Sequence, residues 1–179
     1  MTESAYLLAF GWASDALFRY IGIDEAYRAA GHSFYTVESH LVYSKEVSTG
    51  EPLRFTTQLL GRDHKRLHIF HAMYHGDTGD LLCTNEQMLV HVDMSAGRSI
   101  DTLPGPKAAL DAVWAVHRRL ARPAVTAIRE PLDADAAVRA RLELLPQVAA
   151  ERAVWEGVEG EESLAAGDLV RYFGRAFGD

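Results

Sequence analysis

The sequence predicts an α+β fold in which a curved antiparallel sheet wraps around one long helix. Two observations support this fold class. Apolar side chains recur at helical spacing from the start of the chain to Ile21, and strand-like segments separated by short turns follow up to Asp93. Short turns join antiparallel neighbours, whereas parallel strands need long crossover connections. A helix with one broad apolar face also needs a covering layer, which the sheet would supply.

The helix is expected to begin at the first or second residue. Its apolar face is formed by residues three or four positions apart, namely Tyr6, Phe10, Ala13, Leu17 and Ile21. Gly22 is expected to end the helix, because glycine readily adopts the left-handed conformation that follows many helices.

The strands are rich in β-branched and aromatic residues and are bounded by turn residues. They are SFYTVESHLVYSKEV (33–47), PLRFTTQLL (52–60), RLHIFHAMYH (66–75) and LLCTNEQMLVHVD (81–93). Because the connections are short, these strands are expected to form a meander in which each strand pairs with the next.

The C-terminal part of the chain is expected to be helical. KAALDAVWAVHRRLA (107–121) predicts a helix that ends before Arg122–Pro123, and TAIREPL (126–132) predicts a short edge strand or an extended cover. Two further helices are predicted within 133–179. The domain organisation is therefore a core domain over 1–132 and a helical extension of unknown role over 133–179.

Composition limits the classes of function. A net charge of −7 over 179 residues argues against nucleic-acid binding and against binding to an anionic membrane surface. No apolar run approaches the roughly 20 residues that a membrane-spanning helix needs, and no signal peptide is recognisable. A cytoplasmic location is expected. The single cysteine, Cys83, lies within an apolar strand pattern and is expected to be a packed thiol.

Several short segments of the sequence resemble one enzyme family. MTESAYLLAF, SDAL, SFYTVESHLVY, GRDHKRLHIFH and NEQMLVHVD are similar to the betainyl-CoA thioesterase group of the hotdog-fold acyl-CoA thioesterases, often found fused to carnitine dehydrogenases. The resemblance covers roughly residues 1–132. It implies a hotdog fold, a homodimer or homotetramer, and hydrolysis of a short acyl-CoA, with a cationic acyl group such as betaine as one candidate. Coenzyme A would enter as part of the substrate, and no cofactor is expected.

The resemblance also implies where catalysis would take place. In related thioesterases a strand leads into an Asp-x-x-Gly-His-Met loop just before the helix, and Met1 falls on the last residue of that loop, so the family aspartate is expected upstream of residue 1. The amide of Glu3, next to Thr2, would polarise the thioester carbonyl, because amides at a helix start lack internal partners. The alternative is an ordinary first helical turn.

Glu38 is the candidate to replace that aspartate. Regular alternation would place Phe34, Thr36, Glu38 and His40 on one strand face. An acid among aromatic and β-branched residues is expected to have either a hydrogen-bonding partner or a functional role. His40 would orient Glu38 or relay a proton. For Glu38 the alternative is a carboxylate that is hydrogen-bonded at a subunit contact. For His40 the alternative is a structural histidine.

Two further groups of residues are substrate candidates. Basic residues at one turn, which could hold the phosphates of coenzyme A, are Arg62, Lys65 and Arg66. Rings that could contact a trimethylammonium group are Trp12 and Tyr35, with Tyr20 and Phe34 as further members. A solvated turn and ordinary core packing are the respective alternatives.

No metal site is expected. His71 and His75 share a strand face but lie roughly 13 Å apart, too far for one ion, and no metal-binding motif is present. A site assembled from separate strands, for instance from His71 and His91, is the alternative. A different class of function also stays open, in which the chain is a hotdog binding or assembly module without catalysis, or a shortened thioesterase.

Overall fold

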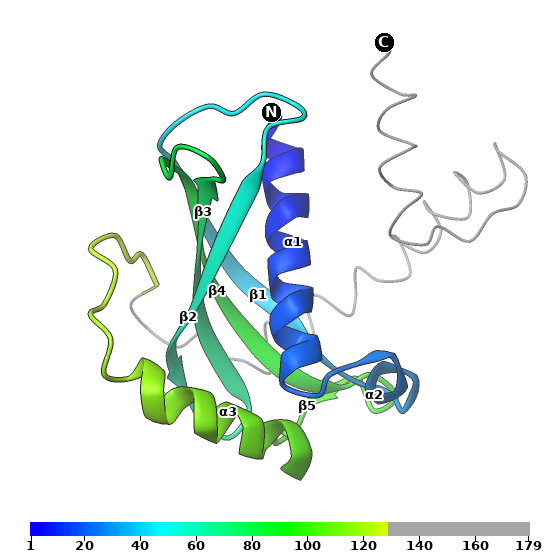
Figure 1. The fold of residues 1–179 in the computed structure, drawn as a ribbon. Coiled ribbons are helices and arrows are strands. Elements are labelled where there is room, and N and C mark those ends of the chain that lie inside the picture. Colours follow the sequence, from blue (N-terminus) through cyan, green and yellow to red (C-terminus); the bar gives the residue numbers. More distant parts are fainter. Residues whose placement is uncertain (129–179) are drawn as a thin grey trace, which may run out of the picture. The chain divides into compact units, whose positions relative to one another are not determined.

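The computed structural model describes residues 1–128 of the 179-residue chain. A long helix, α1 (Glu3–Tyr20), packs on one face of an antiparallel sheet (Figure 1). The remaining elements are α2 (Glu25–Ala29), β1 (His32–Tyr43), β2 (Leu53–Arg62), β3 (Arg66–His75), β4 (Leu81–Asp93), β5 (Arg98–Ser99) and α3 (Pro104–His117). The predicted fold class is confirmed for these residues. Neither α2 nor β5 was predicted from the sequence.

The strand order is β1-β4-β3-β2, with β5 paired to β4. The four-strand meander was therefore only partly correct. Strands β2, β3 and β4 form a meander, but β1 pairs with β4 and not with β2. The physical reason is the connection at 44–52, which is longer than a hairpin turn and carries the chain from one sheet edge to the other.

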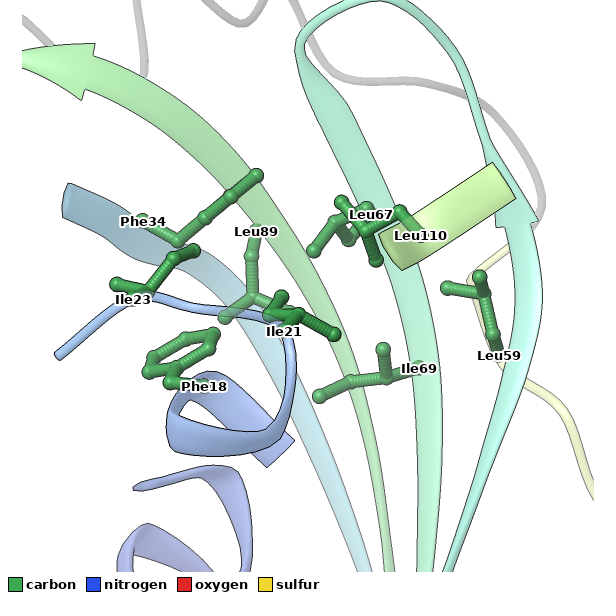
Figure 2. Packing of buried hydrophobic residues seen from close by; sticks show 9 residues of the cluster. All are labelled: Phe18, Ile21, Ile23, Phe34, Leu59, Leu67, Ile69, Leu89 and Leu110. Atoms are coloured by element: carbon green, nitrogen blue, oxygen red, sulfur yellow. The ribbon is translucent and has the colours of Figure 1, made fainter. Parts of the chain in front are cut away.

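The main core cluster lies between the C-terminal half of α1 and the sheet (Figure 2). Phe18 of α1 stacks on Phe34 of β1 with ring centroids 6.1 Å apart, and Leu110 brings α3 into the same cluster. The other members are Ile21, Ile23, Leu59, Leu67, Ile69 and Leu89. We call the face that carries these residues the inner face and the opposite one the outer face.

A second apolar cluster fixes the N-terminal half of α1. Tyr6, Ala9 and Phe10 pack with Met73 and with Cys83, which is completely buried. Burial raises the pKa of the Cys83 thiol to about 11, so the sulfur stays protonated at neutral pH. The packed thiol predicted from the sequence is confirmed.

Gly22 ends α1 as predicted. Its φ of +85° lies in the left-handed region, which lets the Ile23 N–H donate to the Phe18 carbonyl over 2.8 Å. Ile23 is then fully buried in the main core cluster.

The segment after α3 covers part of the outer face. α3 ends at His117, earlier than predicted, and the chain then continues without regular structure to Ile128. The Arg122 guanidinium donates to the Leu60 carbonyl over 2.8 Å, and the Ala127 N–H donates to Glu86 Oε2 over 2.5 Å. For TAIREPL (126–132) the two alternatives were a short edge strand and an extended cover. The described part of this segment, up to Ile128, is an extended cover. The helices predicted over 133–179 lie outside the described residues.

Candidate functional site

The start of α1 presents its first amides at the surface. Thr2 is the N-cap residue, with an extended backbone, but its side chain makes no capping hydrogen bond. Its carbonyl instead accepts the N–H groups of Ala5 and Tyr6 at 3.0 and 3.2 Å. Thr2 and Glu3 are both exposed. The positive end of the helix dipole is therefore accessible to an anionic or polarised oxygen.

Glu38 and His40 form a close pair on the outer face. His40 Nε2 lies 2.6 Å from Glu38 Oε1, and both side chains are partly exposed. The expectation that Phe34 and Glu38 share a face was wrong. The register of β1 on β4 shifts between Thr36 and Glu38, so the residue between them bulges and the alternation restarts.

Cross-strand partners show the consequence of this bulge. Thr36 pairs with Leu89 of the core, whereas Glu38 pairs with Met88 and His40 pairs with Glu86. Within one chain, the pair of Glu38 and His40 thus lies across the sheet from the face that packs on α1. The structure joins Glu38 to His40, but it does not bring either of them to Thr2 and Glu3.

A second acid–histidine pair on the same face was missed from the sequence. His68 Nε2 lies 2.6 Å from Glu86 Oε1, and Glu86 is almost fully buried. Glu86 Oε2 also accepts the backbone N–H groups of Ala127 and Ile128. A single acid within the predicted strand LLCTNEQMLV was the available signal, because a buried charge needs partners.

A polar layer crosses the inner face between the two apolar clusters. Ser14 Oγ lies 3.1 Å from His71 Nε2 and 3.2 Å from Gln87 Oε1, and Thr57 Oγ1 lies 2.8 Å from His71 Nδ1. His71 is completely buried, and burial lowers its pKa to about 4. The ring is therefore neutral at physiological pH.

The basic turn is held by contacts within the chain. Arg62 is bonded to Asp111 of α3, and its side chain is only 8% exposed. The Arg66 guanidinium donates from Nε to Asp63 Oδ2 over 2.6 Å, and Lys65 Nζ donates to Ser99 Oγ over 2.9 Å. Burial works against ionisation of Asp63, but hydrogen bonds from Lys65 and Arg66 outweigh it and lower the pKa of that carboxyl.

The candidate aromatic residues do not form one cluster in the chain. Trp12 is 44% exposed and Tyr20 is 76% exposed, both on α1. Tyr35 packs with Val90 and Val92 on the outer face, and Phe34 is buried against Phe18. No aromatic cage is assembled from these four rings within one chain.

His91 is a buried histidine without a solvent-facing nitrogen. Its Nε2 lies 2.6 Å from the Tyr27 hydroxyl, and its Nδ1 lies 3.3 Å from the Ile100 carbonyl. Burial lowers the pKa of His91 and raises the pKa of Tyr27. Among residues 1–128, no three His, Cys, Asp or Glu side chains are placed to hold a metal ion. In the same part of the chain, no helix is both long and apolar enough to cross a membrane.

Comparisons with known proteins agree with this fold. A family model described as the thioesterase-like superfamily matches residues 1–142. The betainyl-CoA thioesterase of Pseudomonas aeruginosa is 43% identical over 124 residues, which are 69% of this chain and 78% of that protein. The L-carnitine dehydrogenase/betainyl-CoA thioesterase of Rhizobium meliloti is 44% identical over 123 residues, which are 69% of this chain. The match spans only about a quarter (25%) of the length of that relative.

Solved structures show the same architecture. A candidate thioesterase from Pseudomonas putida aligns with a TM-score of 0.60 and 31% identity, covering 73% of this chain and 85% of that one. A hypothetical protein from Staphylococcus aureus, solved in complex with CoA, aligns with a TM-score of 0.64 and 22% identity, covering 73% and 84%. At that identity the second match supports the fold alone.

Proposed function

Because the chain belongs to the thioesterase-like superfamily, we propose that it hydrolyses acyl-CoA thioesters, with betainyl-CoA as the first substrate to test. The observation that carries this proposal is the 43% identity to a betainyl-CoA thioesterase over 78% of the length of that relative. The reaction adds water across the thioester and releases a carboxylic acid and the free thiol of coenzyme A.

The proposed oxyanion site is the start of α1. Attack on a thioester carbonyl places negative charge on its oxygen, and the backbone amide of Glu3, an exposed residue, is proposed to donate to that oxygen. Glu3 is the first residue of α1, and the N–H groups of the first helical turn have no partner within the helix. The proposed role thus belongs to the backbone N–H of Glu3 and not to its side chain.

The proposed general base is Glu38, oriented by the 2.6 Å contact with His40. Within one chain this pair lies on the outer face, away from α1. The proposal therefore requires a site shared between protomers, in which Glu38 of one chain activates water for a thioester held at the α1 start of another. A homodimer or homotetramer is part of the proposal for this reason.

Contacts with the substrate are also proposed for the basic turn and for the candidate aromatic residues. Lys65 and Arg66 are partly exposed at the β2–β3 turn, where they are proposed to contact the phosphates of coenzyme A. Arg62 is proposed to shape this turn through Asp111. Trp12 and Tyr35 come from opposite sides of the sheet, so they are proposed to contact a cationic acyl group together with rings of another protomer.

One substitution tests the oxyanion site directly. Glu3→Pro removes the proposed N–H donor, and proline is tolerated at the first position of a helix, especially after an extended residue such as Thr2. Release of free thiol from betainyl-CoA should fall by about 10²-fold or more in kcat, the usual effect of losing one oxyanion donor. The matched control Glu3→Gln keeps the N–H and should stay within about threefold of the wild type.

A mixing experiment tests the shared site. Glu38→Gln alone should lower kcat strongly, because a glutamine cannot accept the proton of water. If the site combines two chains, mixtures of Glu3→Pro and Glu38→Gln protein should recover part of the activity, since every mixed dimer contains one intact site. Absence of recovery, with confirmed subunit exchange, would contradict the shared site.

A binding module without catalysis is the second candidate. The separation of Glu38 and His40 from the α1 start within one chain favours it. In that case acyl-CoA would bind in a calorimetric titration, while no thiol would be released from a panel of short acyl-CoA esters that includes betainyl-CoA.

A further inference from the structure

The contacts that hold α1 on the sheet are of two kinds. Both core clusters are largely apolar, and apolar contacts are non-directional, so by themselves they favour burial of the helix without fixing its position along its own axis. In the second cluster the Tyr6 hydroxyl also donates to the Lys45 carbonyl over 3.3 Å, in the connection after β1. The polar layer between the two clusters is directional. Ser14 contacts β3 through His71 and β4 through Gln87, and His71 contacts β2 through Thr57.

With Gln87 Oε1 as the acceptor facing Ser14, one arrangement of protons satisfies the whole layer. Ser14 donates its single hydroxyl proton to Gln87 Oε1, so its oxygen must accept the proton of His71 Nε2. A neutral histidine with a proton on Nε2 has an acceptor at Nδ1, which takes the hydroxyl proton of Thr57. Each member of the chain therefore has a defined direction of donation.

The same arrangement excludes a nucleophilic role for Ser14. A serine nucleophile needs a histidine nitrogen that accepts its proton, whereas here His71 Nε2 is the donor. Ser14 and His71 are also almost fully buried. The layer is thus suited to fixing geometry and not to reacting with a substrate.

We propose that Ser14 and His71 are positioning residues that fix α1 along the sheet and thereby place the amide of Glu3 at the thioester oxygen. Ser14 lies eleven positions after Glu3, which corresponds to about 16 Å along a rigid helix, so a shift at Ser14 is transmitted to the first turn. A displacement of about 1 Å at a reacting centre can lower the rate by about 10²-fold. The inference rests on the proposed thioesterase function and on the oxyanion site at the start of α1.

Kinetics of variants in the polar layer test this proposal. Ser14→Ala removes both helix–sheet hydrogen bonds and should lower kcat for thiol release at least tenfold, with KM within about twofold. Ser14→Thr keeps the hydroxyl and should recover kcat to within about threefold of the wild type. Leu110→Ala, a buried substitution in α3, is the control for lost stability and should leave kcat within about twofold. A loss of kcat in Ser14→Ala no greater than in Leu110→Ala would overturn the proposal.

A second measurement does not depend on activity. Nitrogen-15 chemical shifts of the His71 ring at pH 7 should show the proton on Nε2, and the amide signals of residues 3–6 should move in Ser14→Ala but not in Leu110→Ala. A proton on Nδ1, or unchanged amide signals in Ser14→Ala, would overturn the positioning role. If the wild type releases no thiol from any acyl-CoA, the proposed function fails, while these spectra still decide whether Ser14 and His71 position α1.

Discussion

His68 Nε2 lies 2.6 Å from Glu86 Oε1, so a nearly buried carboxylate on the outer face is paired with a histidine of the neighbouring strand. The other carboxylate oxygen of Glu86 accepts the N–H groups of Ala127 and Ile128. Glu86 therefore attaches the segment after α3 to the sheet.

Replacement of Glu86 is expected to be strongly destabilising. Glu86→Ala leaves His68 and two backbone N–H groups without their acceptor, and loss of one partner of a buried pair costs about 3 kcal/mol or more of the free energy of unfolding. Urea denaturation at pH 7 measures this change. The exposed acid Asp77 supplies the control Asp77→Ala, which should change the free energy of unfolding by less than about 0.5 kcal/mol. Equal effects of the two substitutions on the free energy of unfolding would show that Glu86 does not stabilise the attachment of this segment to the sheet.

His71 is expected to make the stability depend on pH. Its pKa is about 4 in the folded protein against 6.5 normally, so below pH 6.5 the unfolded chain takes up a proton that the folded chain rejects. The contribution of neutral His71 is complete above pH 6.5 and is lost as the pH falls towards 4. The loss amounts to about 3 kcal/mol.

The matched comparison for this pH dependence is His71→Gln, which keeps hydrogen-bonding groups but does not titrate. The free energy of unfolding of the wild type should fall more steeply than that of His71→Gln between pH 6.5 and 4.5, because only the wild type carries this proton. Parallel curves for the two proteins would refute the assignment.

The hydroxyl of Tyr27 is expected to stabilise the contact between α2 and β4. Tyr27→Phe leaves the acceptor His91 Nε2 buried without its 2.6 Å partner, which should cost about 2 kcal/mol of the free energy of unfolding. Thermal and urea unfolding measure the effect. Tyr20→Phe removes the same atom from a side chain that is 76% exposed and should change stability by less than about 0.5 kcal/mol.

The basic turn is expected to affect substrate binding and not the chemical step. Lys65→Ala and Arg66→Ala should each raise KM for acyl-CoA about three- to tenfold with kcat nearly unchanged, because phosphate contacts lie away from the reacting carbonyl. Higher salt should reduce the difference in KM between each variant and the wild type, since ions screen exposed charges. The result would contradict a phosphate-binding role if the variants and the wild type had the same KM at low salt.

The edge of β1 is expected to form the subunit contact. β1 pairs with β4 alone among the described strands, and we expect a strand from a second copy to pair with its other edge. Val42, which is 41% exposed near the end of β1, supplies the test. Val42→Asp should weaken dimerisation at least tenfold in sedimentation equilibrium. The control Val125→Asp alters a side chain that is 56% exposed outside the sheet and should leave the dimer intact.

The sequence by itself determined the type and approximate bounds of the long elements. Helical periodicity identified α1, and the turn residues at 61–65 and 76–80 separated β2, β3 and β4. These features depend on local backbone preferences and on the burial of one face, both of which can be read from neighbouring residues. The family resemblance likewise rested on contiguous segments of the sequence, and the comparisons confirmed it.

The tertiary structure decided which side chains meet. The bulge between Thr36 and Glu38 moved Glu38 and His40 to the outer face, and the pairing of β1 with β4 placed His40 opposite Glu86. Contacts between residues far apart in the chain, such as Ser14 with His71 and Glu86 with Ile128, have no local pattern. The physical reason is that register and strand order follow from the packing energy of the whole sheet, and one extra residue in a strand reverses every later side chain.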